Sequence, residues 1–264
     1  MANTQQFTKK QSRWRRYLLS TLSLCLLLSS EVVADQINIA VASNFITTLR
    51  QLAHSFEEQS GHTLRISSAS TGKLYAQISH GAPFDLFLSA DEARPARLVQ
   101  EGKAVASSRA TYALGQLVFW SPKNAVNGNA IALLKSTAIK RIAIANPKTA
   151  PYGLAAQSVL HKLGLWQHSK IKRVRGENIS QTFQFVTSGA VDGGFVALSQ
   201  THTWQQGGLV WRIPTDYYAP IRQQVVLLNR AAKNRAALSF LTFILADDGQ
   251  KIIQQSGYAI EEAE

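Results

Sequence analysis

The feature of this sequence that most restricts its fold is a repeated alternation of strand-like and helix-like patterns. Ile37, Ile39 and Val41 alternate with polar residues, and apolar residues then recur at helical spacing over 45–56. Apolar periods of two and then 3.6 residues predict a strand followed by a helix. The pattern returns, in whole or in part, at residues 64–78, 86–99, 142–163 and 195–198. Because such alternation favours parallel sheets with helices on both faces, we expect an α/β protein built on mostly parallel sheets.

Two long extended runs, at residues 114–120 and 221–228, lack this short rhythm. Their places near the middle and the end of the chain predict strands that cross between two lobes. We expect the first lobe to contain residues 35–117 and 224–264, and the second to contain residues 118–223. Lobes joined by strands permit hinge closure on a ligand. A single continuous domain is the alternative.

The first 34 residues have the pattern of a secretory signal peptide. A basic start is followed by an apolar run from Leu18 to Leu28 and by small residues that end at Ala34. The apolar run is shorter than the roughly 20 residues that span a bilayer. We therefore expect residues 1–34 to be removed and the rest to be exported, with an uncleaved membrane anchor as the alternative.

Cysteine content and charge exclude several classes of site. Cys25 is the only cysteine and lies in the expected signal peptide, so disulfides, a cysteine nucleophile and a thiolate metal site are absent from the exported part. The chain carries 28 Lys and Arg against 16 Asp and Glu, but its basic residues are scattered. We therefore expect no nucleic-acid partner, although a broad positive field would concentrate small anions.

Four junctions between a strand and the next helix are rich in hydroxyl, amide or glycine residues. They lie at residues 42–44, 67–72, 150–153 and 177–180. Ligands collect at the carboxyl ends of strands in open parallel sheets, where helix starts expose unpaired N–H groups and the positive end of the helix dipole. Each junction taken alone is typical of an N-cap. Four of them facing one cleft would form an anion site without Lys or Arg.

Enzyme motifs are absent from the sequence. It contains no Gly-x-Ser-x-Gly elbow, no His-Glu-x-x-His and no Walker-type loop. A hydrolase that used Ser43 or Thr71 as nucleophile would need a general base beside the hydroxyl, and none of the four junctions contains a histidine. We therefore expect a binding protein and not an enzyme, with a secreted hydrolase as the less favoured alternative.

Five stretches of the chain, in order, carry a resemblance to a known family. They are residues 39–45, 70–78, 81–91, 146–153 and 194–198. The Gly-Ala-Pro-x-Asp-x-Phe-x-Ser-Ala-Asp block at 81–91 is the most specific of them. Together they resemble the periplasmic molybdate-binding proteins of ABC transporters. The resemblance implies a two-lobed type II periplasmic binding protein that binds molybdate or tungstate, needs no cofactor, is monomeric and serves a membrane permease.

The same resemblance implies a set of ligand-binding residues. The set is Ser43, Asn44, Thr71, Tyr152 and Ile179. Ser43 and Thr71 would supply hydroxyls, Tyr152 a phenol, and Asn44 and Ile179 amides. One branch of the family takes a tyrosine from the strand at 194–198, but Ala197 stands there, which favours Tyr152. The metal would be held only through the oxyanion oxygens, by Ser43, Thr71, Tyr152 and Ile179, with no direct bond from protein to metal.

The chemistry of these groups agrees with the implied ligand. Molybdate, tungstate and sulfate are unprotonated dianions at neutral pH and only accept hydrogen bonds, whereas hydrogen phosphate also donates one. All the implied groups are able to donate. Glu177 is the one carboxylate nearby, and we expect it to point away from the cleft. Because sulfate has the same charge and shape as molybdate, a receptor for another tetrahedral oxyanion such as sulfate is the alternative, and cavity size would decide between them.

Overall fold

The computed structural model describes residues 35–124, 128–167, 171–202, 204 and 207–261. The signal peptide predicted at 1–34 lies outside the described residues, and Asp35–Glu264 forms one compact unit. The strands are β1 (Gln36–Ala42), β2 (Thr63–Ala69), β3 (Leu86–Leu88), β4 (Ala110–Gly115), β5 (Leu117–Ser121), β6 (Arg141–Ala145), β7 (Lys172–Gly176), β8 (Gly193–Ala197), β9 (Leu209–Arg212) and β10 (Ile221–Leu227). The helices are α2 (Ile46–Ser60), α3 (Thr71–Ser79), α4 (Ala93–Gln100), α5 (Ala130–Lys135), α6 (Pro151–Lys162), α7 (Ile179–Thr187), α8 (Leu198–Thr201), α9 (Arg235–Leu245) and α10 (Asp247–Gln255), with short 3-10 turns at η1 (Ser43–Phe45), η2 (Ala106–Ser108), η3 (Thr215–Tyr217) and η4 (Asn229–Ala231).

The described strands form two five-stranded sheets, ordered β2-β1-β3-β10-β4 and β7-β6-β8-β5-β9. We call each sheet with its helices the first and the second lobe. In the first, β1 pairs parallel with β2 and β3, while β10 pairs antiparallel with β3 and β4. In the second, β6 pairs parallel with β7 and β8, while β5 pairs antiparallel with β8 and β9. Four strands of each sheet therefore share one direction, which confirms the predicted two-lobed α/β fold with mostly parallel sheets.

One strand of each sheet, β10 in the first and β5 in the second, runs opposite to the other four. The chain enters each of these two strands from the other lobe. The extended run expected at 114–120 is in fact two strands, because β4 ends at Gly115 in the first sheet and β5 begins at Leu117 in the second. The parallel strands of each sheet end at the junctions that face the other lobe, so a strand that arrives from there must run the opposite way. The lobe boundaries themselves, at 117, 118, 223 and 224, stay a prediction.

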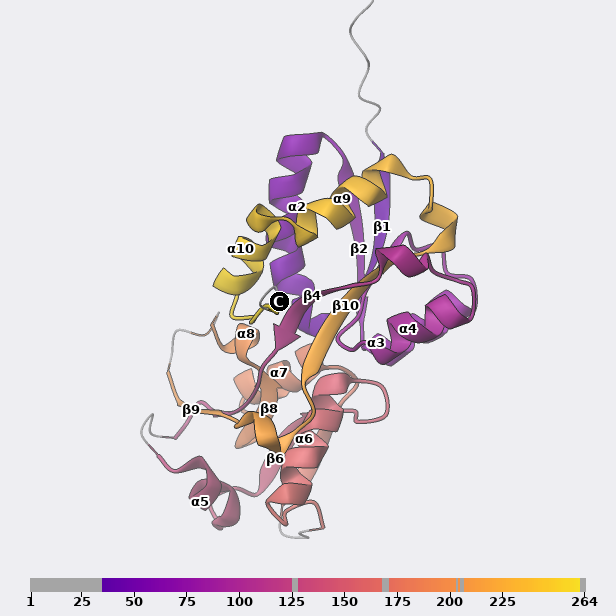
Figure 1. The fold of residues 1–264 in the computed structure, drawn as a ribbon. Helices are drawn as coiled ribbons and strands as arrows, with labels where there is room; N and C mark the ends of the chain where they lie inside the picture. Colours follow the sequence, from indigo (N-terminus) through magenta and orange to yellow (C-terminus); the bar gives the residue numbers. More distant parts are fainter. Residues whose placement is uncertain (1–34, 125–127, 168–170, 203, 205–206, 262–264) are drawn as a thin grey trace, which may run out of the picture. The chain divides into compact units, whose positions relative to one another are not determined.

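Each sheet buries both of its faces, which explains the apolar runs in the strands. In β1, Ile37, Ile39 and Val41 pack with α2 and α9, whereas Ala40 packs on the other face with α3 and α4. Figure 1 shows these two pairs of helices on opposite sides of the first sheet. Residues of β5 likewise alternate between two clusters on opposite faces of the second sheet. This layering holds the strand ends, and the junctions that follow them, in fixed positions.

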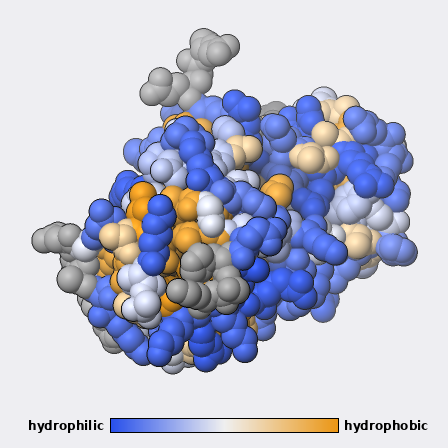
Figure 2. Space-filling model, turned by 90° about the horizontal axis from the view of Figure 1, so that it is seen from below, coloured by the Kyte–Doolittle hydropathy of each residue, from blue (hydrophilic) through white to orange (hydrophobic). Residues whose placement is uncertain are grey.

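The surface seen from below in Figure 2 is mostly hydrophilic, with its largest hydrophobic area on the left of the view and smaller ones elsewhere. Among the residues that the structure describes, no helix combines the length and the apolar character needed to cross a bilayer. The same residues contain no group of three or more His, Cys, Asp or Glu side chains placed to hold a metal ion.

Candidate functional site

A small cavity between the two lobes brings the four predicted junctions together. It is lined by Ala42, Ser43, Asn44, Ser70, Thr71, Ala90, Ala150, Pro151, Tyr152 and Ile179. All five residues of the implied ligand set are therefore at one place, and none of the ten lining residues carries a charged side chain. The cavity has a volume of about 10 Å³, which is room for the centre of about one water molecule.

Helix starts form the walls of this cavity. Ser43 opens η1 directly after β1, and Thr71 opens α3 with only Ser70 between it and β2. From the second lobe, Pro151 and Tyr152 open α6 and Ile179 opens α7. The first N–H groups of a helix have no partner within it, and the helix dipole makes this end positive. The arrangement therefore offers a positive environment without any cationic side chain.

The hydroxyl at the start of α3 is not used as a cap. Ser70 occupies the N-cap position of α3 but makes no capping hydrogen bond, and its buried Oγ has no hydrogen-bond partner. At the start of α7, in contrast, Asn178 accepts from the Gln181 backbone N–H at 2.9 Å. The N-cap interpretation is thus confirmed for Asn178. Ser70 keeps its hydroxyl available at the cavity wall, which the sequence did not reveal, because neighbouring serines in the 67–72 loop have the same chemistry.

Two other hydroxyls at the cavity also have a hydrogen to donate. Thr71 Oγ1 accepts from the Ala90 backbone N–H at 3.2 Å, which leaves its own hydrogen unused by that contact. Tyr152 is 1% exposed, and its Oη has no hydrogen-bond partner. Burial, followed by the nearby phenols of Tyr258 and Tyr112, raises the pKa of Tyr152 well above its ordinary value. The Tyr152 phenol is therefore protonated at neutral pH and able to donate.

Asn44 contributes differently from its neighbours. Its side-chain Nδ2 donates to Gln223 Oε1 at 2.7 Å and to Tyr258 Oη at 3.1 Å. Both side-chain hydrogens are thereby used inside the protein. The group of Asn44 that is left to face an anion is its backbone N–H, in the first turn of η1.

Several contacts close the two lobes over the cavity. The Gly72 backbone N–H donates to the Thr149 carbonyl at 2.9 Å, and Ser180 Oγ donates to the Ser43 carbonyl at 2.9 Å. A Cβ on Gly72 would lie only 3.1 Å from the Thr149 backbone. Glycine at position 72 therefore allows the backbones of the two lobes to approach closely.

Glu177 takes part in a further contact between the lobes. Its Oε2 lies 2.6 Å from Lys73 Nζ on α3, and both side chains are about half exposed. The hydrogen bond from Lys73 lowers the pKa of Glu177, so this carboxylate is charged at neutral pH. Glu177 is not among the residues that line the cavity.

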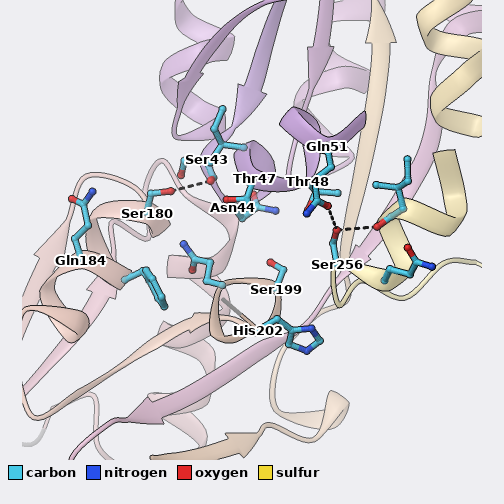
Figure 3. A pocket seen from close by; sticks show the side chains of 15 residues that line it. Ser43, Asn44, Thr47, Thr48, Gln51, Ser180, Gln184, Ser199, His202 and Ser256 are labelled. Atoms are coloured by element: carbon cyan, nitrogen blue, oxygen red, sulfur yellow. Dashed lines mark hydrogen bonds between the residues drawn. The ribbon is translucent and has the colours of Figure 1, made fainter. Parts of the chain in front are cut away.

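A larger groove of about 590 Å³ adjoins the cavity. Ser43 and Asn44 line both spaces, and Figure 3 shows the groove with Ser43, Thr47 and Gln51 from the first lobe opposite Ser180, Gln184 and Ser199 from the second. The residues labelled in Figure 3 have neutral polar side chains, apart from His202, which is the one titratable residue among them. Ser43 and Asn44 thus lie where the small cavity meets the groove.

Two α/β lobes that enclose a small donor-lined cavity define a solute-binding protein. The chain belongs to the family of bacterial extracellular solute-binding proteins, whose family model matches residues 37–259. It is 43% identical to the molybdate-binding protein ModA of Azotobacter vinelandii, over 89% of this chain and 94% of that protein. It is 41% identical to the molybdate-binding protein ModA of Rhodobacter capsulatus, over 92% of this chain and 95% of that protein.

A solved structure shows the same likeness in three dimensions. The periplasmic molybdate-binding protein of Azotobacter vinelandii aligns with a TM-score of 0.81 and 40% identity, over 86% of this chain and 100% of that chain. These relatives are binding proteins, and the family makes this chain a binding protein rather than an enzyme. The expectation drawn from the five resembling stretches is therefore confirmed at the level of the family.

Proposed function

We propose that this chain captures molybdate, and also tungstate, between its two lobes and delivers it to the membrane permease of an ABC importer. The observation that carries the proposal is the convergence of four helix starts, two from each lobe, on one cavity without a charged side chain. The names of the relatives support the choice of anion. Export to the periplasm, a monomeric state and the absence of a nucleic-acid partner remain parts of this proposal.

The proposed ligand set is Ser43, Asn44, Thr71, Tyr152 and Ile179, to which the cavity adds Ser70. Ser43, Thr71, Tyr152 and Ser70 present hydroxyl groups, and Asn44 and Ile179 present backbone N–H groups. Such a set suits an anion that accepts hydrogen bonds at every oxygen and donates none. The metal of the anion would contact the protein only through its oxygens.

Binding requires some separation of the lobes. A tetrahedral oxyanion has five heavy atoms and needs more room than a single water molecule, whereas the cavity is about 10 Å³. The contacts from Gly72 to Thr149 and from Ser180 to Ser43 would break when the lobes separate to admit the ligand. Hinge closure of this kind converts ligand contacts into stability of the closed form.

Thermal unfolding of purified, dialysed protein tests the proposal. A ligand at 100 times its dissociation constant adds about 2.7 kcal/mol to the free energy of unfolding. For a chain of this size, that corresponds to a rise in melting temperature of roughly 5–10 °C. We expect this rise with molybdate and tungstate, and no comparable rise with sulfate or phosphate at the same concentration.

The same series separates the alternatives. A larger rise with sulfate than with molybdate would assign the site to a different oxyanion. An equal rise with phosphate would contradict the donor-only description of the site, because hydrogen phosphate needs an acceptor. No rise with any of the four anions would refute an oxyanion receptor.

A further inference from the structure

Gln223 lies behind the cavity, at the centre of a buried polar network. Its side chain is fully buried on β10. The pairing of β10 with β4 is irregular between Gln223 and Gln224, and irregularities of this kind often re-aim a side chain toward a site. Gln223 does not line the cavity, and no sequence pattern singled it out.

A backbone carbonyl determines which groups of this network donate and which accept. A carbonyl can only accept, so Tyr258 Oη must donate its hydrogen to the Asn44 carbonyl, at 2.8 Å. Tyr258 Oη then accepts from Asn44 Nδ2 at 3.1 Å. The NH₂ group of the Asn44 side chain, rather than its oxygen, therefore faces the network.

The orientation of Asn44 in turn orients Gln223. Asn44 Nδ2 is 2.7 Å from one end of the Gln223 amide, and that end must therefore be the oxygen, Oε1. Tyr112 Oη lies 3.3 Å from the same oxygen and 3.2 Å from the Ser89 carbonyl, so its single hydrogen has two competing acceptors. The opposite end of Gln223, the NH₂ group, is left to face the interior beside Tyr152.

Gly115 shows that the Tyr152 phenol and the Gln223 amide share one small space. A Cβ on Gly115 would overlap Tyr152 Oη and lie 3.0 Å from Gln223 Nε2. Neither atom has a hydrogen-bond partner in the described structure. The Gln223 amide is also the one group that lowers the pKa of the Tyr152 phenol, against the raising effect of burial. A buried donor and a buried acceptor, each without a partner, therefore lie close to each other.

We propose that Gln223 is a positioning residue that donates to the Tyr152 phenol oxygen and so directs the phenol hydrogen at the bound oxyanion. The inference rests on the proposed function, because it needs an anion in the cavity. It adds a reason for discrimination: with Gln223 as donor, Tyr152 faces the ligand as a donor, which suits an unprotonated dianion and disfavours a ligand that must itself donate.

The test is a comparison of molybdate dissociation constants, measured by calorimetry, in a double-mutant cycle. Gln223→Met removes the amide while keeping the length of the side chain, and Tyr152→Phe removes the phenol. Tyr152→Phe should bind molybdate about 10 to 100 times more weakly, as expected for one hydrogen bond to a charged group, and Gln223→Met should lose part of the same affinity because it acts through the phenol. In the Tyr152→Phe background, Gln223→Met should have little further effect, because its action passes through the phenol.

Gln223→Glu separates donation from packing. It keeps an oxygen to accept from Asn44 and changes the end that faces Tyr152 from a donor to an acceptor. Its affinity should fall at least as far as that of Gln223→Met. Gln224→Met is the matched control, because Gln224 is the neighbouring residue of β10 and its Nε2 donates to Thr111 Oγ1. This control should bind like the unaltered protein.

The outcomes separate the two proposals. If the unaltered protein does not bind molybdate, the proposed function fails and the role of Gln223 fails with it. If the unaltered protein binds but both Gln223 variants, with unchanged melting temperatures, keep full affinity, only the role of Gln223 is overturned. Additive losses in the double variant, or full affinity of Tyr152→Phe, would also overturn it.

Discussion

At the scale of single residues, the position of the Tyr152 phenol depends on the absence of a side chain at Gly115. A Cβ on Gly115 would overlap Tyr152 Oη, although Gly115 is not among the described glycines with a positive φ. Alanine is thus compatible with the backbone but not with the present position of the phenol. The requirement is local in space, whereas Gly115 and Tyr152 are far apart in the sequence.

We expect Gly115→Ala to weaken molybdate binding by displacing the phenol. The loss should approach that of Tyr152→Phe, on the order of tenfold or more for a hydrogen bond to a charged group. Calorimetric titration of the single variants and of the double variant measures it. In the Tyr152→Phe background, Gly115→Ala should reduce the affinity for molybdate much less, since the phenol oxygen that the alanine would overlap is absent. Equal losses in both backgrounds would mean that Gly115 acts through the backbone instead.

At the scale of elements, similar residues at two helix starts have different tasks. Asn178 caps α7 through the Gln181 N–H, whereas Ser70 makes no cap bond to α3 and keeps a buried hydroxyl without a partner at the cavity. One polar residue therefore stabilises its helix, and the other is available to a ligand.

We expect Asn178→Ala to lower the stability of the protein, and Ser70→Ala to weaken its binding of molybdate. Loss of the Asn178 cap should lower the free energy of unfolding by about 1 kcal/mol, or roughly 2–4 °C in melting temperature. Ser70→Ala should leave the melting temperature of the ligand-free protein nearly unchanged and weaken molybdate binding. Thermal unfolding with and without molybdate measures both effects. A Ser70→Ala variant with full affinity would remove Ser70 from the proposed ligand set.

At the scale of the whole molecule, an ion pair joins the two lobes. Lys73 Nζ of the first lobe lies 2.6 Å from Glu177 Oε2 of the second. Lys73 lowers the pKa of Glu177 below its ordinary value of 4.5. The stabilisation that this ion pair gives to the folded protein is therefore fully present above pH 4.5, and it is lost as the pH falls through the lowered pKa of Glu177. Because the pair is exposed, salt screens it and its contribution is small.

We expect Glu177→Gln to weaken molybdate binding slightly at low salt and neutral pH, and to reduce the salt dependence of the affinity. Asp216→Asn is the matched control, because Asp216 pairs with Lys162 at the same distance of 2.6 Å but within the second lobe. Titrations at several salt concentrations should show no change of affinity in the control. An equal change in both variants would point to net charge rather than to lobe closure.

Much of the fold follows from local patterns. The apolar periods of two and 3.6 residues correctly predicted the first strand and helix, β1 and α2, because both faces of the sheets are covered. The end of the strand predicted at 195–198 was wrong by one residue, since Leu198 begins α8. The break at Gln116 was also missed, because residues on both sides of it are extended and only their pairing partners differ.

What the sequence determined by itself is the chemistry of the strand ends: hydroxyls, amides and a phenol, with no histidine, placed where helices begin. Such features are local, and neighbouring residues suffice to read them. Only the tertiary structure decided which of these groups face one cavity and how they are oriented, as for Ser70, Gly115 and Gln223. The hydrogen bond from Asn44 to Gln223 joins residues 179 positions apart, and no local pattern encodes a contact that forms only when the two ends of the chain are packed together.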